Sequence, residues 1–273
     1  MSGKDLRLRR FFNPESGRVV IFPVDHGVSF GPCPGLERMD RVVERGIRGG
    51  ADALVMHKGM MRFLDSVSGR LPGIFMHLSA STQLGPAINR KVIVGTVEEA
   101  VRRGADGVSV HVNLGEECET EMIRDLGIVG SACAEWEIPL LAMVYVRGLR
   151  VPSPVPDAAV AHAARLASEL GADIIKIPAP TDDSVLAEIT AGSPAAIVVA
   201  GGDKVPDSRM LLERVENSLR LGVKGFAIGR NVFQHENPEA LMKAVCGIVH
   251  RSTPVEEALE RMRREPPPVC EGI

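Results

Sequence analysis

The phrase Gly171-Ala-Asp-Ile-Ile-Lys-Ile177 decides the fold of this 273-residue chain, because closely similar phrases recur along it. Gly50-Ala-Asp-Ala-Leu-Val-Met-His57 and Gly104-Ala-Asp-Gly-Val-Ser-Val-His111 are further copies, and Gly222-Val-Lys-Gly-Phe-Ala-Ile-Gly229 is a looser fourth. Each copy follows an amphipathic, charged stretch such as 96–103. The glycine is typical of the position that ends a helix, two residues then turn, and an apolar strand begins. The repeat therefore predicts a series of helix–strand units.

Further apolar runs between these copies complete the set of strands. They are Arg18 to Val24, Gly73 to Leu78, Pro139 to Tyr145, and Ala196 to Ala200. Eight strand candidates thus alternate with helical patterns, which predicts an α/β fold, a single (β/α)8 TIM barrel over residues 18–250. A doubly wound parallel sheet is the structural alternative, but it would usually contain fewer strands.

The two ends of the chain are expected to flank the barrel within one domain, residues 1–273. Residues 1–17 are basic and irregular, and we expect an N-terminal arm or helix that closes the bottom of the barrel. Residues 251–273 are expected to form a C-terminal helix from Val255 to Arg264 and then a loose tail. The prolines that follow Glu265 should stop the helix.

Composition excludes several classes of protein. The net charge is −3 and aromatic residues make up only 4% of the chain, whereas a nucleic-acid binder would show a basic face with stacking rings. No apolar run reaches the roughly 18 to 20 residues of a membrane span. The five cysteines are scattered without a Cys-x-x-Cys pair, so neither a disulfide framework nor a zinc knuckle is indicated. We therefore expect a cytoplasmic protein that binds neither nucleic acid nor membrane.

Polar residues or glycine pairs follow every predicted strand. They are Asp25 to Ser29, His57-Lys58, His77, His111, Tyr145 to Arg147, Lys176, Gly201-Gly202 and Gly229-Arg230. The carboxyl ends of the strands and the loops after them form the active site of such barrels. The pattern therefore predicts a catalytic barrel.

Lys176 is the candidate nucleophile. Strand residues alternate between faces, so Ile174 and Lys176 should point into the barrel, and the amine should lie at its mouth. Desolvation there disfavours the charged form of an amine, and a neutral amine can attack a carbonyl carbon. A lysine that extends to solvent and caps the sheet is the alternative.

Two further residues could transfer protons. Tyr145 shares its strand face with Met143 and Leu141, and a phenol beside a reactive amine can protonate or deprotonate a substrate oxygen. It could instead be an amphipathic ring that completes the barrel core. Asp25 could be a general base or a strand-end carboxylate that caps backbone N–H groups.

Two glycine loops and a group of histidines suggest different ligands. Loops after the seventh and eighth strands are the usual phosphate site of these barrels, so Gly201, Gly202, Gly229 and Arg230 predict phosphate binding.

The histidines at the ends of the first four strands could hold a divalent metal that polarises a carbonyl, or could be hydrogen-bonded polar residues of the interior. These are His26, His57, His77 and His111.

Five ordered motifs resemble the archaeal-type class I aldolase family, and the likeness extends from about Gly17 to His250. The motifs are Pro23-Val-Asp-His-Gly-Val-Ser29, Val144-Tyr-Val-Arg-Gly148, Ile174-Ile-Lys176, Ala200-Gly-Gly-Asp-Lys204 and Gly229-Arg-Asn-Val-Phe-Gln-His235. The resemblance implies that Lys176 forms a Schiff base, Tyr145 donates a proton, and Asp25 is the general base. It also implies that the substrate is bound by Asp25, His26, Gly27, Val28, Ser29, Tyr145, Val146, Arg147, Gly201, Gly202, Gly229 and Arg230.

The resemblance is greatest to transaldolase-type synthases. It implies a sugar phosphate as donor, L-aspartate semialdehyde as acceptor, no metal or other cofactor, and a homo-oligomer such as a decamer. The chain departs from the family at Val146, where proline is usual, and at Ile177-Pro-Ala-Pro180, where a Thr-x-Tyr-like sequence is usual. Fructose 1,6-bisphosphate aldolase is the alternative of the same chemistry. A related thiolase branch shares the Asp-His-Gly and Gly-Arg-Asn motifs but lacks Tyr145, and a non-catalytic sugar-phosphate-binding barrel is a further alternative.

Overall fold

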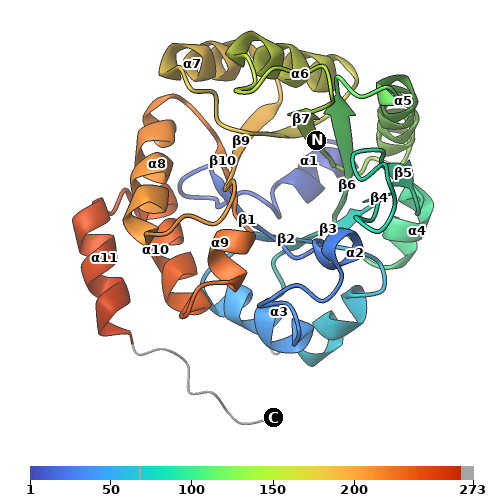
Figure 1. The fold of residues 1–273 in the computed structure, drawn as a ribbon. Coiled ribbons are helices and arrows are strands. Elements are labelled where there is room, and N and C mark those ends of the chain that lie inside the picture. Colours follow the sequence, from blue (N-terminus) through green and yellow to red (C-terminus); the bar gives the residue numbers. More distant parts are fainter. Residues whose placement is uncertain (68, 266–273) are drawn as a thin grey trace.

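The structure is a computed structural model, and it describes residues 1–67 and 69–265. Eight parallel strands close into a barrel in the order β1-β10-β9-β8-β7-β6-β3-β2, and the helices form a ring around it (Figure 1). The strands are β1 (Val19–Pro23), β2 (Ala53–Met56), β3 (Gly73–His77), β6 (Gly107–Leu114), β7 (Leu140–Val146), β8 (Ile174–Ile177), β9 (Ala196–Ala200) and β10 (Gly225–Ala227). This confirms the predicted (β/α)8 barrel.

The remaining elements connect or flank these strands. They are α1 (Gly3–Leu8), α2 (Gly27–Phe30), α3 (Met39–Arg48), η1 (Met61–Ser66), β4 (Ser79–Ala80), β5 (Val92–Ile93), α4 (Val97–Arg102), α5 (Glu119–Glu135), α6 (Asp157–Glu169), α7 (Asp183–Gly192), α8 (Ser208–Arg220), α9 (Arg230–Phe233), α10 (Pro238–Arg251) and α11 (Val255–Arg264). Strands β4 and β5 pair as a small antiparallel sheet outside the barrel. The expected tail at 266–273 lies outside the described residues.

The aspartates of the repeat explain why the phrase recurs. Asp52 accepts the N–H of Val20 on its carboxylate (2.6 Å) and donates its own N–H to the carbonyl of the same residue (2.9 Å). Asp106 forms the same pair of bonds with Ile74, and Asp173 forms it with Leu140. Each carboxylate thus satisfies an N–H at the start of the neighbouring strand, which would otherwise be left unpaired at the barrel bottom.

The glycines of the repeat have the backbone conformation that the sequence predicts. Gly50, Gly104, Gly171 and Gly222 have φ values between 79° and 94°. A side chain at Cβ disfavours this left-handed region, so glycine is the residue that can end each helix and turn directly into the next strand.

Apolar side chains cover both faces of the strands and form one layer inside the barrel and another outside it. Inside the barrel, Ile21, Val55 and Ile174 pack with Phe11, whose ring stacks on that of Phe75 with centroids 3.8 Å apart. Phe11 comes from the N-terminal segment and fills the barrel bottom, while the outward residues pack against the helices. The lower half of the interior is therefore solid, and only the upper end is open to polar chemistry.

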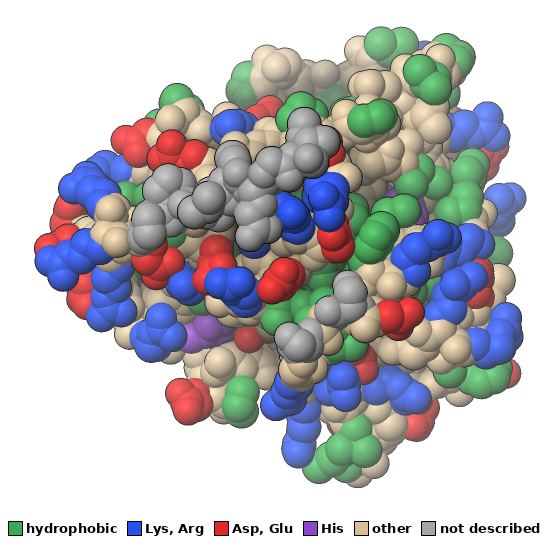
Figure 2. All heavy atoms as spheres, turned by 90° about the horizontal axis from the view of Figure 1, so that it is seen from below, with side chains coloured by type: hydrophobic (Ala, Val, Ile, Leu, Met, Phe, Trp, Pro, Cys, Tyr) green, Lys and Arg blue, Asp and Glu red, His purple; other side chains and the backbone are tan. Residues whose placement is uncertain are grey.

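The outer surface mixes charges of both signs. On the face drawn in Figure 2, lysine and arginine side chains lie among aspartates and glutamates. Several are paired one helical turn apart, such as Arg48 with Glu44 on α3 and Arg261 with Glu257 on α11. None of the described helices combines the length and the apolar character that a membrane crossing needs.

Candidate active site

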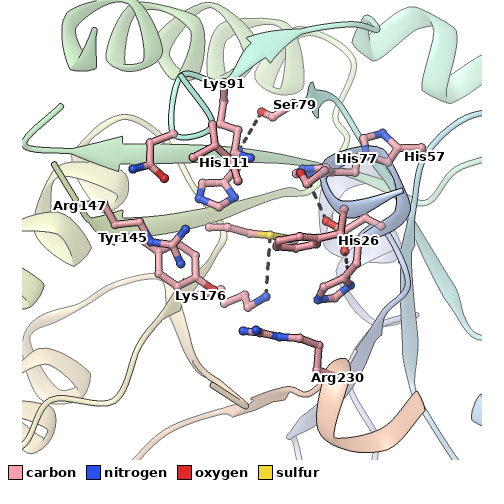
Figure 3. Close-up of a pocket in the computed structure, with 16 residues that line it drawn as sticks. His26, His57, His77, Ser79, Lys91, His111, Tyr145, Arg147, Lys176 and Arg230 are labelled. Carbon is pink, nitrogen blue, oxygen red and sulfur yellow. Dashed lines mark hydrogen bonds and ion pairs between the residues drawn. The ribbon is translucent and has the colours of Figure 1, made fainter. Parts of the chain in front are cut away.

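Lys176 lies on β8 and points into the barrel. It is in register with Met143 on β7 and Val198 on β9, and it shares the inward face with Ile174. Only 7% of the residue is exposed, and its Nζ lies 4.0 Å from the thioether sulfur of Met143. Among the described residues, no carboxylate lies within ion-pair distance of this amine. Lys176 therefore does not reach out to solvent as a cap, and its amine faces the cavity at the barrel mouth (Figure 3).

Tyr145 lies two residues beyond Met143 on the same face of β7, beside the side chain of Lys176 (Figure 3). Its ring centroid is 5.0 Å from that of His111, and the guanidinium carbon of Arg147 lies 4.4 Å above the ring. The cation over the ring face and the imidazole beside it hold the phenol in one orientation. The phenol is half-buried at the cavity wall, where a substrate oxygen could reach it.

Asp25 and the histidines form a polar group on the opposite wall. The Asp25 carboxylate approaches His26 Nδ1 (3.6 Å) and His77 Nε2 (3.7 Å), and His77 Nδ1 hydrogen-bonds to Ser109 Oγ (2.8 Å). Burial alone would raise the pKa of Asp25, but the electrostatic interactions with His77, His26 and Lys176 favour the ionised carboxylate and hold the pKa below its usual value. Asp25 is therefore an ionised carboxylate, ready to accept a proton.

The imidazoles around Asp25 are kept neutral. Burial lowers the pKa of His77 to about 3, although the charge of Asp25 opposes the shift. Burial also lowers the pKa values of His26, His57 and His111. In the described part of the chain, no three histidine, cysteine, aspartate or glutamate side chains are grouped so that they could share a metal ion. His77 and His111 are instead bonded to Ser109 and Asn113, as expected of polar residues in a barrel interior.

The two glycine loops border a second cavity, which shares Lys176, Tyr145 and Arg230 with the first. A Cβ on Gly229 would lie 2.7 Å from His26 Cε1 and 2.9 Å from the carbonyl oxygen of Pro23, so only glycine fits where this loop passes the first strand. Arg230 pairs with Asp203 (2.7 Å), whose side chain is 91% exposed. A phosphate could displace so exposed a carboxylate from the guanidinium.

Asn231 fixes the shape of these loops. Its amide donates to the carbonyls of Gly201 (3.0 Å) and Asp203 (3.1 Å), and its oxygen accepts the N–H of Val205 (2.9 Å). Asn231 is buried, and it joins the loop after β9 to the start of α9. Its place in the Gly-Arg-Asn motif was the available signal, but the sequence does not show that the side chain bridges two loops.

The structure brings most of the predicted site residues to these two connected cavities. Their walls include Asp25, His26, Ser29, Tyr145, Val146, Arg147, Lys176, Gly201, Gly202, Gly229 and Arg230. Gly27 and Val28 lie in the intervening turn of α2 and border neither cavity, and Val28 is 39% exposed. Residues outside the prediction also line the first cavity, chiefly Ser79, Asn89, Lys91 and Met143.

An inward lysine beside a phenol and an ionised carboxylate, with glycine loops next to them, is an arrangement suited to Schiff-base chemistry on a phosphorylated carbonyl compound. A family model of the DeoC/LacD family aldolases matches residues 19–235, from the first strand to beyond α9. The chain belongs to the DeoC/LacD family of aldolases. It is an enzyme of the lysine Schiff-base class, which transfers or releases aldehyde and ketone units.

This aldolase is similar to two synthases in sequence and to a solved aldolase in structure. The 2-amino-4,5-dihydroxy-6-oxo-7-(phosphonooxy)heptanoate synthase of Streptomyces griseus is 41% identical over 249 residues, 91% of each chain. The 2-amino-3,7-dideoxy-D-threo-hept-6-ulosonate synthase 1 of Archaeoglobus fulgidus is 41% identical over 260 residues, 95% of this chain and 96% of that one. A solved archaeal fructose-1,6-bisphosphate aldolase, with its catalytic lysine bound to the carbinolamine intermediate, has a TM-score of 0.82 at 26% identity, covering 91% of this chain and 100% of that one.

The pKa of His77 makes the stability of the aldolase depend on pH. Because the folded-state pKa is about 3, below the ordinary value of 6.5, the unfolded chain gains a proton as pH falls through 6.5 while the folded chain does not. We expect replacement by asparagine, which can still bond to Ser109, to reduce the stability loss between pH 7 and 4.5 by about 2 kcal/mol. Urea unfolding of His77→Asn and wild type at both pH values measures this difference. Equal losses in the two proteins would mean that His77 is protonated in the folded state.

Proposed function

We propose that this aldolase joins a three-carbon ketone unit to L-aspartate semialdehyde through a Schiff base on Lys176. The names of both 41% identical relatives describe seven-carbon 2-amino acids with a ketone at C6 and an oxygen at C4 and C5. A hydroxyl at C4, β to that ketone, is the mark of an aldol bond between C4 and C5. Carbons 1 to 4 then come from an amino-acid aldehyde, L-aspartate semialdehyde, and carbons 5 to 7 come from a ketone donor.

The relatives differ at C7, and that position defines the donor. A methyl group at C7 corresponds to a hydroxyacetone unit, which transaldol cleavage of 6-deoxy-5-ketofructose 1-phosphate would supply. A phosphonooxy group at C7 corresponds to dihydroxyacetone phosphate, added directly. We favour the first donor, in an alternative route to dehydroquinate and the aromatic amino acids. The glycine loops and Arg230 provide for a phosphate in either case.

The proposed reaction begins at the amine of Lys176. Its lone pair attacks the ketone carbon, and loss of water from the carbinolamine gives an iminium. The cationic nitrogen accepts the electron pair of the bond between the α and β carbons as a base removes the β-hydroxyl proton. Hydroxypyruvaldehyde phosphate leaves, and the enamine that remains adds to the aldehyde carbon of L-aspartate semialdehyde. Protonation of the new alkoxide and hydrolysis of the iminium release the product and restore Lys176.

Tyr145 and Asp25 are the proposed groups for these proton transfers. Tyr145 lies beside Lys176, where its hydroxyl can give a proton to the carbinolamine oxygen and exchange one with the hydroxyl at the reacting carbon. Asp25 lies on the opposite wall with a lowered pKa, so it is ionised and can accept a proton. The single observation that supports the proposal most is the buried, inward amine between these two groups.

The test is to incubate the pure protein with L-aspartate semialdehyde and one donor at a time. We expect loss of the semialdehyde and a seven-carbon amino acid detected by mass spectrometry, without phosphate from 6-deoxy-5-ketofructose 1-phosphate and with phosphate from dihydroxyacetone phosphate. Fructose 1,6-bisphosphate is offered separately. Cleavage of this bisphosphate without any loss of semialdehyde would contradict the proposal and favour the activity for which the solved archaeal fructose-1,6-bisphosphate aldolase is named.

We also propose that the enzyme is located in the cytoplasm and assembles into a homo-oligomer. Cys33, Cys118, Cys133 and Cys246 are free thiols in the described part of the chain, as expected in the reducing cytoplasm. Assembly into a homo-oligomer stays a prediction, and size-exclusion chromatography with light scattering measures it.

A further inference from the structure

Lys91 stands on a loop that the reaction described so far does not use. The loop follows β3, and its two ends pair as β4 and β5, with Ser79 opposite Ile93 and Ala80 opposite Val92. Lys91 directly precedes β5, so this pairing fixes its backbone. Its Nζ donates to Ser81 Oγ, which in turn donates to the carbonyl of Ile88 (2.6 Å). The amine is therefore held in place by the loop itself and is directed at the first cavity.

The charge of Lys91 is left without an acidic partner. Among the described residues, no carboxylate lies within 4 Å of Lys91 or of the Arg147 guanidinium, whereas the neighbouring Arg90 pairs with Glu121 (2.8 Å). Lys91 is half-buried, and burial and the charge of Arg147 lower its pKa, although the more distant carboxylate of Asp25 opposes the shift. Two like charges on one cavity wall are unfavourable unless an anion binds between them.

The two cationic parts of the site lie on opposite sides of Lys176. Figure 3 shows Lys91 beside His111 and Arg147 over the ring of Tyr145, with Arg230 on the other side of the Lys176 amine. The glycine loops line the cavity that Arg230 and Arg147 also border and that Lys91 does not, so the side at Arg230 suits a phosphate. The other side has two cations, and Asn89, which binds Glu116 (2.7 Å), is next to them.

We propose that Lys91, together with Arg147, binds the α-carboxylate of the acceptor amino-acid aldehyde and so selects this acceptor. The proposal rests on the function proposed above, because it assigns a place to that acceptor. With the carboxylate held beyond Tyr145, the aldehyde end of the same molecule points back to the enamine on Lys176. With dihydroxyacetone phosphate as donor, its phosphate and the carboxylate of the acceptor then bind to different cations and do not compete; with 6-deoxy-5-ketofructose 1-phosphate, the phosphate leaves with hydroxypyruvaldehyde phosphate before the acceptor binds.

The test compares Lys91→Met with wild type. Methionine keeps an apolar stem but removes the charge, so we expect KM for L-aspartate semialdehyde to rise about 10- to 100-fold, the usual effect of deleting one partner of a charged hydrogen bond. We expect kcat to change less than about 3-fold, and KM for dihydroxyacetone phosphate as donor to stay the same. Butanal, an acceptor of equal chain length without a carboxylate, should react equally with both proteins. Lys91→Arg should restore most of the lost affinity.

Arg90→Met is the matched control. It removes a cation from the same loop, but this cation is paired with Glu121. Its KM for L-aspartate semialdehyde should equal that of wild type. Similar urea midpoints for the variants show that each is folded. Unchanged KM for the semialdehyde in Lys91→Met, or an equal loss with butanal, would overturn the assignment of Lys91 while the proposed function still stands.

Glyceraldehyde 3-phosphate, an acceptor aldehyde that has a phosphate and no carboxylate, tests whether Lys91 and Arg147 bind a carboxylate or a phosphate. If wild type consumes no L-aspartate semialdehyde with either donor, the proposed function itself is wrong. If wild type does consume the semialdehyde but Lys91→Met raises KM only for glyceraldehyde 3-phosphate, the two cations bind a second phosphate and the carboxylate assignment is overturned. A rise in KM for the semialdehyde that is larger than the rise for the aldehyde phosphate supports the carboxylate.

Discussion

Lys176→Met is expected to lower kcat by roughly 10⁴- to 10⁶-fold, the range typical of removing a covalent nucleophile. Without the amine no iminium forms, so no cationic nitrogen accepts the electrons of the breaking bond. Methionine has a similar length and can pack against Met143, so the barrel should remain intact. Because the substitution also replaces a buried polar group that no carboxylate pairs with by an apolar one, we expect an equal or greater free energy of unfolding. Steady-state turnover and urea unfolding measure the two effects.

Lys224→Met provides the control for this prediction. Lys224 is exposed and directly precedes β10 at the opposite end of the barrel, so its loss should leave turnover unchanged. A Lys176→Met protein that is folded and retains more than about a tenth of wild-type kcat would contradict the Schiff-base mechanism at this residue.

Tyr145→Phe is expected to lower kcat by about 10²- to 10⁴-fold, because it removes a general acid–base group and little else. Phenylalanine keeps the ring that contacts His111 and the guanidinium of Arg147, so the cavity wall should keep its shape. The variant still has Lys176, so donor and borohydride should still label it, although more slowly. Turnover together with the extent of labelling after long incubation distinguishes slow chemistry from loss of the site.

The experiment is clean because the chain has a single tyrosine. Wild-type turnover in the Tyr145→Phe protein would remove the phenol from the mechanism. Complete loss of labelling would instead show that the variant no longer forms the Schiff base at Lys176.

The fold could be predicted from the sequence because its repeat reports on local backbone geometry. The glycines of the repeat occupy left-handed positions that few other residues tolerate, so they mark each change from helix to strand. For the aspartates that follow, the sequence indicates only a turn. Their reciprocal bonds to Val20, Ile74 and Leu140 join segments 32 or 33 residues apart, and no local pattern reveals such pairings.

The site could be predicted where strand alternation decides the direction of a side chain. Lys176 and Tyr145 point inward because strand parity requires it once the barrel is closed. The same rule did not locate the end of β6, which continues to Leu114 although the predicted strand ended at His111. Lys91 could not be found this way, because β4 and β5 are only two residues long and a lysine in a polar loop has no pattern that distinguishes it from a solvated one.

The Schiff base itself can be tested by borohydride reduction in the presence of the ketone donor, followed by peptide mass analysis. Reduction should fix the donor carbons irreversibly to one lysine, on the peptide that contains Lys176, and should abolish activity in proportion to the label. An active enzyme that takes up no label, or that takes it up on another lysine, would contradict a Schiff base at Lys176.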